Sequence, residues 1–168
     1  MSLENNPITV LALERAWRQK DVRACYESLA VLPDGVVFRM GHILLEMSPA
    51  IDEEKEMMQR SMGEGREFCL IKTDSSKTII EGGGGEVDMD EIAGALYKVA
   101  ASDKPAIFSH THWDVKKHPL PGYSDVGLGD IPIFNFFRDQ FPLLACRVVF
   151  NSRSTVRALV YKGSTEQI

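Results

Sequence analysis

Two histidines stand one residue apart at the end of a short apolar run, in the segment PAIFSHTH that ends at His112. Such a run, opened by Pro105, predicts a β-strand. Residues i and i+2 of a strand point to the same face, so His110 and His112 would present two imidazoles side by side. Imidazoles are typical zinc ligands, and a catalytic zinc usually takes three protein ligands. The pair predicts a metal site, and the alternative is a polar strand end without ligands.

The length and composition are those of one soluble globular domain. The chain has 168 residues, of which 44% are apolar and 26% are charged, enough for a single core. A net charge of −5 without a basic run argues against nucleic acid or an acidic membrane surface as a partner. No stretch approaches the ~20 apolar residues of a membrane helix. Three separated cysteines outside any CxxC pair indicate reduced thiols and a cytoplasmic protein.

The pattern along the chain predicts an α/β (α+β) protein, in which a mixed central sheet is flanked by helices. Residues 1–34 form an extra N-terminal helical extension, with one helix over 7–31, and residues 35–168 form the metal-binding domain. Helical spacing also favours helices over 42–61, broken near Pro49, and over 131–141, with a further helix capped by Asp88. The expected strands cover 36–38, 67–73, 78–80, 105–112, 145–151 and 155–162.

Two families contain a histidine pair of this kind. The segment HTHWD, His110 to Asp114, resembles the metallo-β-lactamase signature. That signature continues with a histidine where this chain has Val115, and the fold needs later histidines, whereas none follows His118. This resemblance is therefore rejected.

The second resemblance is to the JAMM zinc metalloproteases, also called JAB or MPN-like proteins. Their motif is a glutamate on an early strand followed by H-[ST]-H-x7-S-x2-D, and SHTH at Ser109–His112 is similar to it. The segment REFCLIKT resembles the glutamate strand, with Glu67 and Cys69 at the family's positions and Leu70 in place of a glycine. The resemblance covers about residues 35–162 and implies a JAB/MPN-like fold with cytidine-deaminase-like layering.

The resemblance implies Zn²⁺ held by His110, His112 and an aspartate. The family's spacing would place that aspartate at Tyr123, so the loop here is longer, and Asp130 or Asp125 could serve. Asp130 is preferred because it begins a predicted helix, with Ile133, Phe136 and Phe137 expected to pack against the core. Asp130 as ligand puts Gly127 at the position of the family's serine. Ser124 then supplies that hydroxyl only if the loop folds it back.

The resemblance further implies that Glu67 is a general base and that Ser124 stabilises an oxyanion. The expected function is hydrolysis of an amide or isopeptide bond in a peptide, a ubiquitin-like conjugate or a sulfur-carrier-like conjugate. The alternative is an MPN-like interaction module with weak or no catalysis, which the missing serine at the family's spacing favours.

Overall fold

A computed structural model describes residues 7–41, 43–82, 88–101, 103–114, 119–120 and 130–164. The helices in these ranges are α1 (Pro7–Arg18), α2 (Val22–Ala30), α3 (Asp52–Glu64), α4 (Met89–Val99) and α5 (Asp130–Gln140). The strands are β1 (Val37–Met40), β2 (Ile43–Pro49), β3 (Phe68–Lys72), β4 (Lys77–Glu81), β5 (Ala106–Thr111), β6 (Leu144–Ser152) and β7 (Thr155–Ser164).

The strands form one seven-stranded sheet in the order β1-β2-β7-β6-β5-β3-β4. The β5–β6 pair is parallel and the other neighbouring pairs are antiparallel. The parallel pair needs a crossover, and α5 lies in the connection between β5 and β6. The predicted mixed α/β class with a mixed sheet is confirmed.

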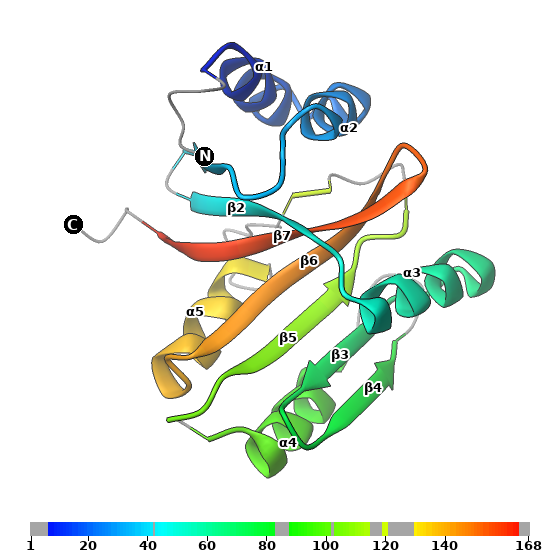
Figure 1. Ribbon diagram of the computed structural model, residues 1–168, viewed down its shortest axis with the longest axis vertical. Coiled ribbons are helices and arrows are strands. Elements are labelled where there is room, and N and C mark those ends of the chain that lie inside the picture. Colours follow the sequence, from blue (N-terminus) through cyan, green and yellow to red (C-terminus); the bar gives the residue numbers. More distant parts are fainter. Residues whose placement is uncertain are drawn as a thin grey trace.

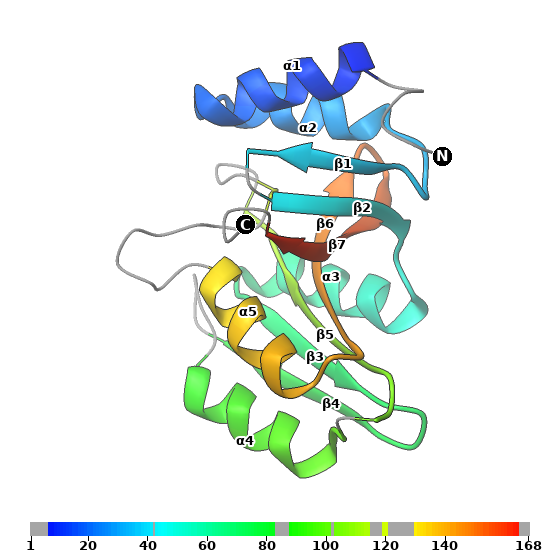
Figure 2. The ribbon, with the colours of Figure 1, turned by 90° about the vertical axis from the view of Figure 1, so that its left-hand side faces the viewer.

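Helices cover both faces of the sheet. Figures 1 and 2 show α3 on one face and α4 with α5 on the other, while α1 and α2 lie together at the β1 end. Side chains alternate along each strand, so Phe68 and Leu70 of β3 pack with Met57 and Met58 of α3. Cys69, between them, belongs to the larger core cluster, which contains residues of α4, α5 and the N-terminal helices.

The N-terminal segment contains two helices where the sequence predicted one. Lys20 takes a left-handed backbone conformation, with φ of 56°, which ends α1. Asp21 then caps α2, and its side chain accepts a hydrogen bond from the N–H of Ala24. The apolar pattern continues through this turn because both helices pack on the same core. Periodicity alone therefore did not reveal the break.

Arg157 of β7 joins α2 to the sheet. Its guanidinium donates to the carbonyl oxygens of Leu29, at 3.1 Å, and Leu32, and it pairs with Asp34 at 2.8 Å. Carbonyls at a helix C-terminus lack the hydrogen bonds of the helix interior. Arg157 adds a donor to the Leu29 carbonyl, which also accepts the N–H of Leu32 at 3.2 Å. Leu29 is itself fully buried in the larger core cluster. The N-terminal helices therefore pack into the core that the sheet builds.

The predicted helix over 42–61 was wrong in its first half. Residues 43–49 form β2, between β1 and β7, and α3 begins only at Asp52. The signal for a strand was present, because Ile43, Leu45 and Met47 are buried and alternate with less buried residues. That spacing has the period of two that a strand requires.

A buried ion pair joins α3 to the centre of the sheet. Glu54 is fully buried and accepts two hydrogen bonds of 2.8 Å from Arg147 of β6. Arg147 also donates to the carbonyl of Pro49, and Glu54 accepts the N–H of Ile51. The two charges are thus paired and hydrogen-bonded, which burial of charge requires.

Candidate metal centre

The histidine pair lies at the end of β5, as the sequence predicted. Parallel pairing with β6 and antiparallel pairing with β3 hold His110 in the sheet interior. His112 follows the last strand residue, and its N–H donates to the carbonyl of Val149 at 2.8 Å. The ring of His110 lies 5.7 Å from that of Phe134 in α5. Both imidazoles are therefore fixed by backbone pairing on the face that α5 covers.

Asp130 is the first residue of α5. Ile131, Phe134 and Phe137 are the buried residues of this helix. The prediction that Ile133 and Phe136 pack in the core with Phe137 was wrong for Phe136, which is 52% exposed. The helix is turned so that positions 131, 134 and 137 face the sheet, an arrangement that places the carboxylate of Asp130 beside the two imidazoles.

Three side chains meet at this point. The Nε2 atoms of His110 and His112 are 3.0 Å apart. Asp130 bridges them, with Oδ1 at 3.2 Å from Nε2 of His110 and Oδ2 at 3.2 Å from Nε2 of His112. The three residues offer ligand atoms that all lie within 4.8 Å of one another and could hold a metal ion.

The spacing of the donor atoms fits a shared metal ion. Two ligands at ~2.0–2.1 Å from a tetrahedral zinc lie about 3.3 Å apart. The separations in the structure are close to this value: 3.0 Å between the two nitrogens, and 3.2 Å from each nitrogen to a different oxygen of Asp130. A ring nitrogen carries at most one proton, so protons cannot satisfy every contact in this triangle at once. A cation shared by all three groups would do so.

The charges around the site favour a cation. Burial alone would lower the pKa of His110, but the charge and hydrogen bond of Asp130, with the charge of Glu67, raise it to about 9. Burial alone would raise the pKa of Asp130, yet the charges and hydrogen bonds of the two histidines hold it well below its usual range. Metal binding therefore has to displace a proton from His110.

Glu67 lies just before β3 and beside the histidines. Cys69 is the register partner of His110, and Glu67 lies two residues before Cys69, on the same side of the chain. Opposed residues point to the same face. The side chain is half-buried, and its negative charge acts on both His110 and Cys69. The structure thus puts a carboxylate on the metal side of the sheet, although β3 begins one residue later than predicted.

The other predicted site residues lie outside the described residues. They are Asp125, the alternative ligand, together with Ser124 and Gly127, the two candidates for the serine position. The preference for Asp130 over Asp125 therefore stays a prediction, as does the role of Ser124.

Sequence reasoning missed two residues that support the site from the opposite face. Thr111 stands between the histidines and is buried, with 1% of its surface exposed. Its hydroxyl oxygen is 2.6 Å from that of Ser61 in α3. The H-[ST]-H pattern contains Thr111 but gives no hint of its partner. Ser61 is 50 positions away in the chain, and only the packing of α3 on the sheet joins them.

Comparison with models of protein families, with curated proteins and with solved structures finds no match to this chain. Among the described residues, no helix has the length and apolar character needed to cross a membrane.

Proposed function

We propose that this chain is a zinc-dependent hydrolase of the JAMM type that cleaves an amide or isopeptide bond. The observation that carries the proposal is the meeting of His110, His112 and Asp130, with ligand-atom separations of 3.0 to 3.2 Å and the charge of Glu67 close by. Two imidazoles and a carboxylate form a donor set that catalytic zinc sites use.

The order of elements supports the resemblance. Helix α3 is followed by β3, preceded by Glu67, then by β4 and α4, by β5 with its histidines, and by α5, which begins at Asp130. This is the order that the JAMM resemblance implies for the glutamate, the HxH pair and the aspartate. The support comes from the site and its layout, because fold alone does not establish function.

The proposed chemistry assigns separate roles to the side chains. A zinc ion held by this donor set would polarise a carbonyl group and lower the pKa of a water molecule. Glu67 is the proposed general base: it takes the proton of the attacking water and later delivers it to the leaving nitrogen. Burial and backbone pairing of His110 keep the ligand geometry rigid. A hydroxyl or backbone N–H would stabilise the oxyanion, and Ser124 is the candidate.

The proposed substrates are peptides or ubiquitin-like proteins, including sulfur-carrier-like conjugates, and this choice rests on the resemblance. The proposed location is the cytoplasm, where the three buried free cysteines would stay reduced. The second candidate function is an interaction module of the MPN type, favoured by a specific observation: Gly127 stands where the family has its serine if Asp130 is the ligand.

The metal content of the purified full-length chain separates the two functions. We expect stoichiometric zinc after dialysis, and its loss from the double variant His110→Ala/His112→Ala without loss of the fold. Hydrolysis of peptide and ubiquitin-like fusion substrates should then stop with a chelator and return with zinc. A wild-type protein that retains no zinc overturns the metal proposal. Zinc without hydrolysis of any substrate favours the interaction module.

A further inference from the structure

The hydroxyl group of Thr111 connects three elements on the face of the sheet opposite the metal centre. It lies 2.6 Å from the hydroxyl of Ser61 in α3, and it accepts the N–H of Phe68 at 3.1 Å. Ser61 is fully buried, as is Phe68, and Thr111 is 1% exposed. Thr111 can accept the N–H on one lone pair while donating its own proton to Ser61. All of these contacts are thus shielded from water.

The contact with Phe68 occurs where the chain enters β3. Helix α3 ends at Glu64, and its C-cap Gly65 has a left-handed φ of 66°. Two residues link Gly65 to Phe68. The register between β3 and β5 begins with the pair Cys69 and His110. One residue before Cys69, the N–H of Phe68 donates to the side-chain hydroxyl of Thr111. This bond takes the place of a backbone hydrogen bond to β5. The two residues between this bond and the turn are Arg66 and Glu67.

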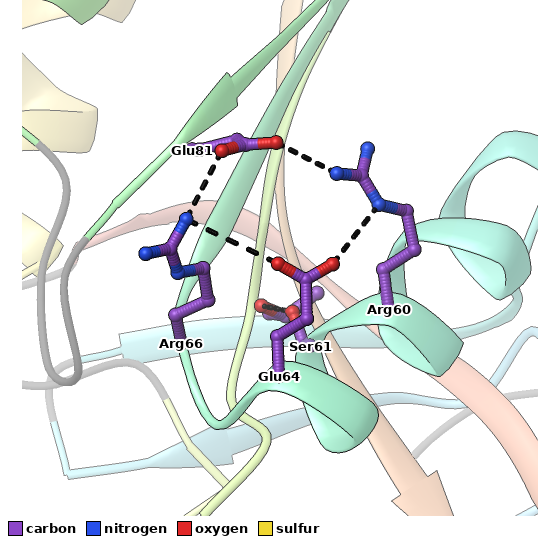
Figure 3. Close-up of polar contacts among 6 residues, drawn as sticks. Arg60, Ser61, Glu64, Arg66 and Glu81 are labelled. Atoms are coloured by element: carbon purple, nitrogen blue, oxygen red, sulfur yellow. Dashed lines mark hydrogen bonds and ion pairs between the residues drawn. The ribbon is translucent and has the colours of Figure 1, made fainter.

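The surface contacts around the same segment are exposed. Figure 3 shows Arg66 reaching Glu81 and Glu64, and Arg60 reaching the same two carboxylates. The shortest of these ion pairs, Arg60 with Glu81 at 2.7 Å, has side chains 41% and 49% exposed. Exposed ion pairs contribute little to stability. In addition, the N–H of Gly82 donates to the carbonyl of Glu67 at 2.7 Å.

We infer that Thr111 is a positioning residue for Glu67. Its side chain points away from the metal centre, because the residues on either side of it, His110 and His112, point toward it. Its buried hydroxyl fixes the backbone of Phe68 to β5 and to α3, and this sets the distance between Glu67 and the histidines. The catalytic relevance of this inference rests on the proposed function.

Two substitutions of Thr111 distinguish the effect of its shape from the effect of its hydrogen bonds. Valine has nearly the shape of threonine but lacks the hydroxyl, so Thr111→Val should leave the packing of β5 and the histidines in place. It would leave the buried N–H of Phe68 without an acceptor, which destabilises the local structure. Serine retains the hydroxyl, so Thr111→Ser should behave like the wild type. Thr78→Val, on the neighbouring strand β4, is the matched control.

The first test is amide hydrogen exchange of Phe68 in the full-length protein, measured by NMR. We expect exchange to become about tenfold faster or more in Thr111→Val, with Leu70 and Ile71 little changed. Ser61→Ala, which removes the partner on α3, should have a smaller effect in the same direction. Thr111→Ser and Thr78→Val should match the wild type. Unchanged exchange at Phe68, or equally faster exchange along all of β3, overturns the inference.

The second test uses zinc content and the visible spectrum of the cobalt(II)-substituted protein. We expect Thr111→Val to bind as much metal as the wild type. Its cobalt(II) spectrum should shift toward the spectrum of Glu67→Gln, whereas Thr111→Ser should have the wild-type spectrum. A Thr111→Val spectrum identical to the wild type overturns the role toward Glu67. If the wild type holds no metal, the proposed function fails, and the exchange measurement alone decides whether Thr111 holds the segment.

Discussion

Nε2 of His112 lies 3.2 Å from Oδ2 of Asp130, although 18 positions separate the two residues in the chain. One follows the end of β5 and the other begins α5. The crossover that joins the parallel strands β5 and β6 brings the helix start back to the strand end. This contact brings Asp130 close enough to the histidines to hold a metal ion with them, although its distance along the chain departs from the spacing that the JAMM resemblance implies.

Substitution of Asp130 should weaken zinc binding severely, whereas Asp125→Ala should change it little. Loss of Asp130 would remove one of the three proposed donors and leave the histidines without their carboxylate. Competition with a chromophoric chelator measures the affinities. Asp139→Asn, an exposed position on the same helix, is the control. If the Asp125 variant binds more weakly than the Asp130 variant, the ligand lies in the loop.

Glu67→Gln should leave the zinc content unchanged and lower hydrolysis by about 10²-fold or more, the usual scale for general acid–base catalysis. The amide keeps the size of the side chain but cannot take up a proton. Zinc analysis and initial rates are measured on the same preparation, with Glu56→Gln, an exposed position of α3, as the control. Loss of zinc from Glu67→Gln would show that Glu67 is a ligand.

Glu54→Gln should destabilise the fold by about 3–5 kcal/mol, because Arg147 would remain buried without its counter-charge. The pair is formed by bonds of 2.8 Å between side chains that are 9% and 0% exposed. Urea unfolding followed by circular dichroism gives the change. The control is again Glu56→Gln, which should change the free energy of unfolding by less than about 0.5 kcal/mol. A Glu54 variant as stable as the control contradicts this prediction.

Arg157→Met should loosen the N-terminal helices more than the sheet. The substitution keeps an apolar stem and removes the donors to the carbonyls of Leu29 and Leu32. The Leu29 carbonyl keeps the N–H of Leu32, whereas a buried group left unpaired costs about 1–3 kcal/mol. Limited proteolysis should cut the Arg157→Met variant faster than the wild type within residues 7–34. Arg39→Met, at an exposed position of β1, is the control and should be cut at the wild-type rate. Equal protection of this segment in both variants would show that Arg157 is dispensable there.

The three cysteines should resist a thiol reagent in the native protein at pH 8 and react fully in denaturant. All three are buried. Burial, with a smaller contribution from Asp21, raises the pKa of Cys25 to about 11, and burial raises that of Cys146 to about 12. The reactive thiolate is therefore scarce at pH 8. Absorbance of the released thiol product measures the rate, and rapid labelling of native protein would contradict the burial.

Local patterns determined much of the fold. Asp88 caps α4 as predicted, and its side chain accepts from the N–H groups of Asp90 and Glu91. β5 and α5 also lie within a residue or so of their predicted bounds. These features depend on residues close together in the chain, such as an apolar run, a cap or a proline. Fold class followed from the alternation of such elements. Where two patterns competed, at 43–49, the strand came from pairing with β1 and β7.

At the site, the sequence by itself determined that His110 and His112 share one face, because that follows from the geometry of any strand. Tertiary structure decided that Asp130 reaches them and that the charge of Glu67 acts on His110. It also decided that Ser61 meets Thr111. Each of these contacts depends on strand order and on the rotation of a helix over the sheet. Those are set by the packing of the whole core, and no short stretch of the chain encodes them.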